Sequence, residues 1–336
     1  MKRSSDRVLF ITAGSIGDAA LTSGLLRHLV ESEPEARFTI AAGPGAVSLF
    51  ADTPRLEQLI PIRKRRRAGH WLDLWRQVAG RRWKIVVDMR GSGLAFVLWA
   101  QRRFIYRSFR QPAGTPPLHK AQEAARTIGL LANPPSPFLY VSAATQARAD
   151  ELIGAGGPIL AIAPAATWPP KTWPAERFAE AAVELLGAGG PLAGGRALLT
   201  GGRDDGPDFE PIRSALPPSR VIDLVGLDLL TTYACFRRVA LFVGNDSGLM
   251  HLAAAAGAPT LGLFGPSDER RYGPWGARTT VVRSARSFSD CEAAIRIGGT
   301  RKSYMTDLSV ASVVRAARDL LARTSAGVDA GAAAVS

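Results

Sequence analysis

The segment from Val243 to His251 combines small, polar and ionisable residues at the point where a buried strand should meet a helix. The backbone N–H groups of Ser247 and Gly248 are expected in the first turn of that helix, where unsatisfied donors and the helix dipole favour a phosphate. Asp246 beside such a site is best explained as an acceptor of hydrogen bonds from the hydroxyls of a sugar or ribose. His251 lies four residues after Ser247 and so on the same helical face, where it either reaches the same anion or is a satisfied core histidine.

Two more loops of the same half of the chain follow predicted strands. Residues 164–174 form a loop stiffened by prolines and two tryptophans, and this loop carries Thr167 and Lys171. A lysine in this position can neutralise a departing diphosphate, although the ordinary alternative is a solvated surface lysine. The loop at residues 201–206 offers Asp204 or Asp205 as an acceptor for ribose hydroxyls.

A fourth candidate is the tight turn from Ala13 to Asp18, between an apolar run and an amphipathic helical pattern. Ligands bind at this edge of open α/β sheets. The turn lacks the three-glycine dinucleotide fingerprint, and its carboxylate stands where a phosphate would sit, so a pyrophosphate is not expected here. Taken by itself, the turn favours Asp18 as a cap of the following helix.

The segments that position these residues alternate between strand-like apolar runs and helical patterns, which predicts βαβ units and parallel sheets. The strand candidates of the first half are residues 8–12, 38–42, 59–62, 85–88 and 104–106. Those of the second half are residues 159–163, 197–200, 221–222, 240–243 and 260–264, with helices at 175–186, 229–236, 247–256 and 310–323. The fold class is therefore α/β, with two doubly wound, Rossmann-like domains. A stretch rich in proline and small residues near 133–144 separates them, so we place the domains at 1–145 and 146–323, and we expect a disordered tail at 324–336.

Composition limits the classes of function. The net charge of +13 is concentrated in residues 1–150, which hold 23 Lys and Arg against 11 Asp and Glu. These cations either steer an anionic partner or form a solvated basic face. No apolar run reaches the ~18 residues of a membrane span, no secretory cleavage site follows the first residues, and two cysteines suit a reducing compartment, so we expect a cytoplasmic protein. No nucleic-acid-binding motif is present in the sequence, and nucleic acid is not an expected partner.

Taken together, the motifs resemble glycosyltransferase family nine, the heptosyltransferases of the lipopolysaccharide inner core. The resemblance rests on Gly14-Ser15-Ile16-Gly17-Asp18, on residues 164–174, and on Asn245-Asp246-Ser247-Gly248-Leu249-Met250-His251-Leu252 followed by Leu263-Phe264-Gly265-Pro266. It covers nearly the full length in order. Ala165 replaces the family's usual glycine, and only Cys291 remains of a cysteine cluster, in a divergent stretch from 286 to 304.

The resemblance implies a GT-B fold that binds the acceptor on the first domain and the donor on the second, with the reaction in the cleft between them. It implies that Asp18 is the catalytic base, that Lys171 binds phosphate, and that transfer is inverting and needs neither a metal ion nor a cofactor. Donor contacts are then expected from Thr167, Lys171, Asp204, Asp246, Ser247, Gly248 and His251. Acceptor contacts are expected from Gly17, Arg63, Lys64, Arg90, His119 and Lys120.

The expected substrates are a nucleotide sugar, with ADP-heptose as the first candidate, and an anionic glycolipid acceptor, which allows peripheral contact with the inner leaflet of the membrane. Two alternatives remain open. A nucleotide-sugar epimerase of the same fold would need a second acid or base near Asp18, and the sequence offers no clear one. A protein that binds nucleotide sugars without catalysis would not need both Asp18 and Lys171.

Overall fold

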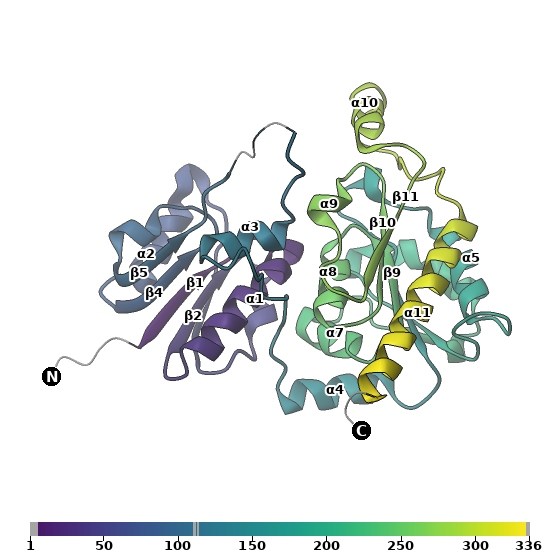
Figure 1. The fold of residues 1–336 in the computed structure, drawn as a ribbon, viewed down its shortest axis with the longest axis horizontal. Helices are drawn as coiled ribbons and strands as arrows, with labels where there is room; N and C mark the ends of the chain where they lie inside the picture. The colour runs from purple at the N-terminus through teal and green to yellow at the C-terminus, as the bar shows by residue number, and fades with distance from the viewer. Residues whose placement is uncertain (1–5, 110–111, 113, 334–336) are drawn as a thin grey trace. The chain divides into compact units, whose positions relative to one another are not determined.

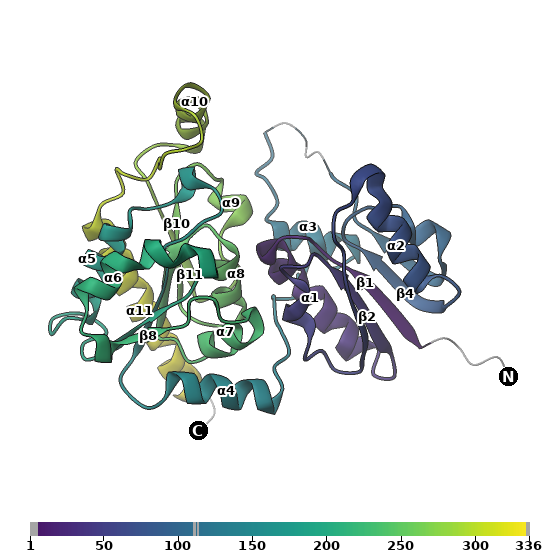
Figure 2. The same ribbon diagram turned by 180° about the vertical axis from the view of Figure 1, so that it is seen from behind.

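The computed structural model describes residues 6–109, 112 and 114–333. The chain divides into two compact units, residues 1–142 and 143–336, three residues before the boundary expected from the sequence. Each unit is a parallel sheet covered by helices on both faces, as Figures 1 and 2 show from opposite sides. The predicted α/β class with two doubly wound units is confirmed. Within the described residues, no helix is both long enough and apolar enough to span a membrane.

The first unit is built on a five-stranded parallel sheet with the order β3-β2-β1-β4-β5. Its strands are β1 (Arg7–Ile11), β2 (Arg37–Ala42), β3 (Leu56–Pro61), β4 (Arg82–Asp88) and β5 (Trp99–Ile105). Its helices are α1 (Ile16–Ser32), α2 (Gly69–Val78) and α3 (Lys120–Thr127), with short 3₁₀ turns η1 (Val47–Phe50), η2 (Arg66–Ala68) and η3 (Leu94–Val97). Helix α2 and η3 pack on one face of the sheet, and α1 and α3 lie together on the other (Figure 1).

The second unit is built on a six-stranded parallel sheet with the order β11-β10-β9-β6-β7-β8. Its strands are β6 (Ile159–Ala163), β7 (Arg196–Leu199), β8 (Val221–Asp223), β9 (Leu241–Asn245), β10 (Thr260–Phe264) and β11 (Thr279–Arg283). Its α-helices are α4 (Ala143–Ile153), α5 (Ala175–Leu186), α6 (Glu210–Ala215), α7 (Leu229–Phe236), α8 (Gly248–Ala255), α9 (Glu269–Tyr272), α10 (Phe288–Gly298) and α11 (Val310–Ala333). Its 3₁₀ turns are η4 (Pro169–Lys171), η5 (Arg203–Phe209) and η6 (Pro218–Arg220).

A large apolar core fixes the strands of the second sheet against α5, α6 and α11. Buried strands there read as continuous apolar runs because helices cover both faces of a parallel sheet. Strands β6 and β10 accordingly have the bounds that the sequence predicts, and so do helices α5 and α7.

Among the differences from the sequence-based prediction, β3 and β4 each begin three residues earlier than predicted, strand β11 was not predicted, and two further differences have a clear physical reason. Strand β5 begins at Trp99, five residues before the predicted strand, because as an edge strand it carries exposed polar side chains that hide its β character. The predicted disordered tail at 324–336 is wrong over 324–333, where α11 continues. The residues concerned are rich in alanine, which has the highest helix propensity. A segment of this kind can extend an existing helix even though it has no hydrophobic period.

Candidate active site

Asp18 lies at the point where the first sheet reverses its strand order. Strands β2 and β3 lie on one side of β1, and strands β4 and β5 lie on the other. The turns after β1 and β4 therefore flank a crevice at the carboxyl edge of the sheet. Gly43, at the end of β2, lets the neighbouring turns approach closely, because a Cβ there would lie 2.5 Å from the carbonyl oxygen of Gly14. The fold therefore places Asp18 at a ligand-binding edge.

The start of α1 leaves the carboxylate of Asp18 exposed and oriented by one neighbour. Ser15, and not Asp18, is the N-cap residue, and its Oγ accepts a hydrogen bond from the backbone N–H of Asp18 at 3.2 Å. The Ser15 hydroxyl in turn donates to Asp18 Oδ2 at 2.7 Å. Since the capping role belongs to Ser15, the exposed carboxylate of Asp18 remains able to accept a further proton or hydrogen bond.

A cavity of about 180 Å³ adjoins Asp18 within the first unit. Its lining includes Thr22 of α1, Met89 after β4, and Tyr106 after β5. It also includes Lys120 and Glu123 of α3, whose Nζ and Oε2 atoms lie 2.9 Å apart. The cavity thus combines the Asp18 carboxylate with a Lys120–Glu123 ion pair, an arrangement that offers hydrogen-bond acceptors and a cationic donor to the hydroxyl groups of a substrate.

Glu123 and Tyr106 are site residues that the sequence analysis did not select. The Tyr106 hydroxyl donates to Glu123 Oε2 at 3.1 Å, and Glu123 is only 8% exposed. The available signal was the spacing of three residues between Lys120 and Glu123, which places them on one side of a helix. Tyr106 is brought to them by tertiary structure alone.

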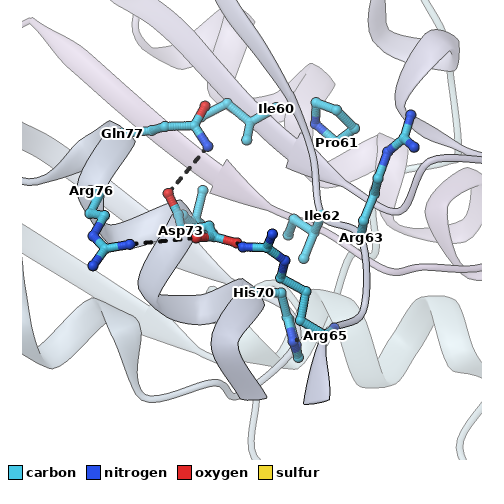
Figure 3. A pocket seen from close by; sticks show the side chains of 10 residues that line it. Ile60, Pro61, Ile62, Arg63, Arg65, His70, Asp73, Arg76 and Gln77 are labelled. Atoms are coloured by element: carbon cyan, nitrogen blue, oxygen red, sulfur yellow. Dashed lines mark hydrogen bonds and ion pairs between the residues drawn. The ribbon is translucent and has the colours of Figure 1, made fainter. Parts of the chain in front are cut away.

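A second cavity in the first unit, of about 440 Å³, is strongly basic (Figure 3). Arg63, Arg65, His70 and Arg76 line it, and the carboxylate of Asp73 accepts from Arg65 at 2.5 Å and lies 3.8 Å from Arg76. Three guanidinium groups and one carboxylate in the lining leave a net positive charge, which suits a phosphate or an acidic sugar. Arg63 therefore lines the basic cavity, whereas the exposed Lys64 is not among the lining residues.

The other predicted acceptor residues are not lining residues of either cavity. The guanidinium of Arg90 stacks 5.0 Å from the ring of Trp71. The imidazole of His119 is 8% exposed and accepts, through Nδ1, a hydrogen bond from the N–H of Ala121 at the start of α3. Gly17 lies in the first turn of α1. Asp18 and Lys120 thus line the same cavity, whereas Arg90 and His119 are not among its lining residues.

The second sheet reverses its strand order between β6 and β9, and the two strongest donor-site candidates flank that point. Lys171 follows β6 in η4, and Asp246 follows β9 directly. The Lys171 ammonium and Asp246 Oδ2 form an ion pair in which the carboxylate side chain is 6% exposed and the lysine side chain 24%. The pair is thus accessible mainly from the lysine side.

Asn245, which the sequence analysis placed in the motif but not in the site, braces the Lys171 loop. Its buried side chain accepts from the N–H of Trp173 at 3.1 Å and donates to the carbonyl of Pro164. Because both ends of the loop are tied to the residue that precedes Asp246, the ammonium and the carboxylate are held in a fixed relation.

A distant segment, Ser303 to Leu308, holds the same loop from the other side. The N–H of Tyr304 donates to Pro170 O at 3.1 Å, and Ser303 Oγ donates to Thr172 O. The indole of Trp173, fully buried, donates to Leu308 O at 2.9 Å. Residues 303 and 304, the last two residues of the divergent stretch from 286 to 304, therefore position the lysine loop.

The remaining donor-site candidates lie at the same carboxyl edge. Ser247 is the N-cap residue of α8, and its Oγ is buried without a hydrogen-bond partner among the described residues, so it can bond to a ligand. Gly248 begins α8, where first-turn N–H groups lack intrahelical acceptors, and His251 further along it is 5% exposed. Thr167 and Asp204 are exposed on the loops after β6 and β7.

The alternative aspartate, Asp205, is already used within its own loop. Its Oδ2 accepts from the N–H of Gly202 at 2.7 Å, which leaves Asp204 as the freer carboxylate of the two. Burial raises the pKa of the nearby Asp208 carboxyl, and the charge of Asp205 raises it further. Over the part of the chain that the structure describes, no three His, Cys, Asp or Glu side chains come together in a group that could hold a metal ion.

Comparison with known proteins identifies the family. The model of glycosyltransferase family 9 (heptosyltransferase) matches residues 71–296. Lipooligosaccharide heptosyltransferase 2 of Haemophilus influenzae is 33% identical over 159 residues, which are 44% of this chain and 44% of that protein. Lipopolysaccharide core heptosyltransferase OpsX of the same organism is 23% identical, with 89% of this chain and 92% of OpsX aligned.

A solved structure shows the same fold. ADP-heptose LPS heptosyltransferase II of E. coli superposes with a TM-score of 0.70 at 21% identity, over 95% of this chain and 99% of its own. The predicted GT-B fold type is thereby confirmed. Because the family model spans more than half of the sequence, including the Lys171 and Asp246 loops, the chain is a glycosyltransferase and belongs to glycosyltransferase family 9, the heptosyltransferases.

Proposed function

We propose that this enzyme transfers a heptosyl group from ADP-heptose to an anionic, lipopolysaccharide-core acceptor, with inversion at the anomeric carbon. The observation that carries the proposal is the pairing of Lys171 with Asp246 at the switch point of the second sheet, in a family of heptosyltransferases. The names of OpsX and of the E. coli enzyme support the lipopolysaccharide acceptor and the ADP-linked donor, respectively.

In the proposed mechanism the first unit acts on the acceptor. Asp18 removes the proton of the acceptor hydroxyl as its oxygen attacks the anomeric carbon, and Ser15 keeps the carboxylate oriented. Lys120 in the adjoining cavity, and Arg63 and Arg65 in the larger one, offer cations to phosphates or acidic sugars of the acceptor.

The second unit acts on the leaving group. As the bond between the anomeric carbon and the phosphate oxygen breaks, negative charge develops on the diphosphate. Lys171 and the first-turn N–H groups of α8 stabilise that charge, while Asp246 accepts hydrogen bonds from donor hydroxyls. We place this reaction on the cytoplasmic side of the inner membrane, in keeping with the excess of cations in residues 1–150.

The direct test is an assay with purified full-length enzyme, a heptose-deficient core acceptor and ADP-, UDP- and GDP-linked sugars. We expect mass spectrometry to show one heptose added to the acceptor with ADP-heptose alone. Transfer from another nucleotide sugar would correct the donor. Turnover of the nucleotide sugar without any glycosylated product would instead support an epimerase or a hydrolase and contradict the proposal.

Chelation tests the role given to Lys171 and α8. Because a lysine and a helix N-terminus neutralise the leaving diphosphate in this mechanism, we expect the transfer rate in excess EDTA to stay within about twofold of the untreated rate. The measurement is the initial rate before and after dialysis against EDTA. Complete loss of activity that Mg²⁺ or Mn²⁺ restores would show that a divalent ion does this work.

A further inference from the structure

The outer edge of the first sheet exposes an unusual cluster of apolar side chains. Phe96 and Val97 of η3 are 62% and 66% exposed, and Trp99 at the start of β5 is 71% exposed. Among the described residues, four large apolar side chains are more than 60% exposed, and three of them are these neighbours. We name Phe96, Val97 and Trp99 the β5-edge patch. Contiguous exposed apolar surface marks a site of interaction.

The surroundings of the β5-edge patch are cationic. Arg82 is paired in register with Trp99, and its guanidinium lies 5.0 Å from the centre of the indole ring. The side chain of Arg102, further along β5, is 60% exposed. The sequence has no Asp or Glu in residues 74–87 or 89–122. Glu33 ion-pairs with Lys84 at 2.5 Å and lies 3.9 Å from Arg102.

This charge distribution disfavours a second copy of the chain as the occupant. A two-fold interface would bring the same patch of both copies together and set the arginines of one copy against those of the other. Charged side chains on an edge strand also oppose pairing with another strand. The surface instead suits a partner that is apolar inside and anionic at its face.

An anionic lipid bilayer has that chemistry. Tryptophan prefers the membrane interface, where its ring meets apolar chains and its N–H meets water, and arginine keeps its charge at the headgroups while its stem lies in apolar surroundings. Each cation near an anionic surface increases binding roughly fivefold.

We propose that the β5-edge patch docks this enzyme on an anionic bilayer, with Phe96, Val97 and Trp99 entering the headgroup region and Arg82 and Arg102 contacting lipid phosphates. This inference rests on the proposed function, in which the acceptor is a glycolipid embedded in such a surface. It assigns the contact to the edge of one sheet rather than to the general excess of positive charge.

The test uses the full-length enzyme and vesicles of phosphatidylcholine with or without about one third phosphatidylglycerol. We expect the wild type to cosediment with the anionic vesicles, and the triple variant Phe96→Ser/Val97→Ser/Trp99→Ser to bind them at least tenfold more weakly. Val183→Ser, which changes a 46% exposed apolar side chain of α5 in the second unit, is the matched control and should bind like the wild type. Equal binding by the triple variant would overturn the proposal.

A second variant keeps the test valid if the triple variant folds poorly. Arg82→Gln/Arg102→Gln retains the apolar side chains of the patch. Its affinity for anionic vesicles should be severalfold lower than that of the wild type, and its affinity for neutral vesicles should be unchanged. Unchanged binding would also overturn the proposal. Two other results would overturn it as well. If a variant binds vesicles like the wild type but differs in oligomeric state, the patch contacts a second copy of the chain. If a variant binds vesicles like the wild type but loses binding to a DNA or RNA oligonucleotide, the patch contacts nucleic acid.

Transfer to a delipidated core oligosaccharide separates this proposal from the proposed function. We expect the triple variant to glycosylate that soluble acceptor at the wild-type rate, because no residue of the patch lines either cavity. If the wild type glycosylates no acceptor but its vesicle binding still depends on the patch, then the proposed function fails and the docking surface stands.

Discussion

Replacing Asp18 with asparagine should lower kcat for sugar transfer by roughly 10²- to 10⁴-fold, the usual cost of a lost general base. The amide cannot take the proton of the acceptor hydroxyl. It still offers an oxygen to the Ser15 hydroxyl, so the first turn of α1 should persist and the free energy of unfolding should change little. The measurement is single-turnover transfer with both substrates saturating, together with urea unfolding.

Ser15→Ala separates the loss of the N-cap and of the orienting hydrogen bond from the loss of the Asp18 carboxylate itself. It removes the N-cap of α1 and should cost about 1 kcal/mol of stability, and because the carboxylate proposed as the base remains, kcat should fall much less than in Asp18→Asn. Donor affinity measured by calorimetry should be the same for Asp18→Asn and the wild type. Near-normal turnover of Asp18→Asn, or loss of its donor binding, would make Asp18 a structural or nucleotide-contacting residue.

Replacing Lys171 with methionine should lower kcat by roughly 10²- to 10³-fold, the range seen when one preorganised group that stabilises a developing charge is removed. The methionine keeps most of the length and apolar stem of the side chain but removes the cation that faces the diphosphate. ADP should bind about tenfold or more weakly, whereas AMP, which lacks the second phosphate, should change less. Initial rates and calorimetry with both nucleotides measure these effects.

The ion pair with Asp246 makes a second variant necessary. Lys171→Met leaves a carboxylate that is 6% exposed without its cation, so stability should also fall. The double variant Lys171→Met/Asp246→Asn also lacks the negative charge of Asp246. Its stability should therefore recover towards that of the wild type, while its activity should stay as low as that of Lys171→Met. If activity recovers together with stability, then the role of Lys171 is to hold Asp246 and the loop in place, and it does not stabilise the leaving group.

The units of strand, turn and helix that carry Asp18 and Asp246 could be predicted because their signals are local. A buried parallel strand is an apolar run, and the polar residues that follow it mark the carboxyl edge of the sheet. The same rule explains why the start of β5 was not predicted: Gln101, Arg102 and Arg103 lie in an edge strand and interrupt the apolar run. Helix α11 was predicted too short because alanine-rich sequence has no hydrophobic period, although it has a high helix propensity.

The parts of the site that escaped prediction depend on contacts between distant residues. Glu123 acquires its significance from Tyr106 and Lys120, and only the second of these is near it in sequence. Asn245 reaches across to Pro164 and Trp173, about 80 and 70 positions away. No local pattern encodes such partners, so the sequence could indicate the type of chemistry but not the bonds that fix its geometry.

The tie between the lysine loop and residues 303–308 also sets an order of events in the making of the protein. Trp173 and the carbonyl of Leu308 are separated by 135 positions, a distance that a ribosome covers in roughly 7 to 27 s. Until then a nascent chain has Lys171 but lacks the segment that holds its loop. The first unit, by contrast, has by that time been synthesised in full. A growing chain should therefore acquire the fold around Asp18 well before the loop of Lys171 is held in its final position, so the proposed donor site should be the last part of the enzyme to form.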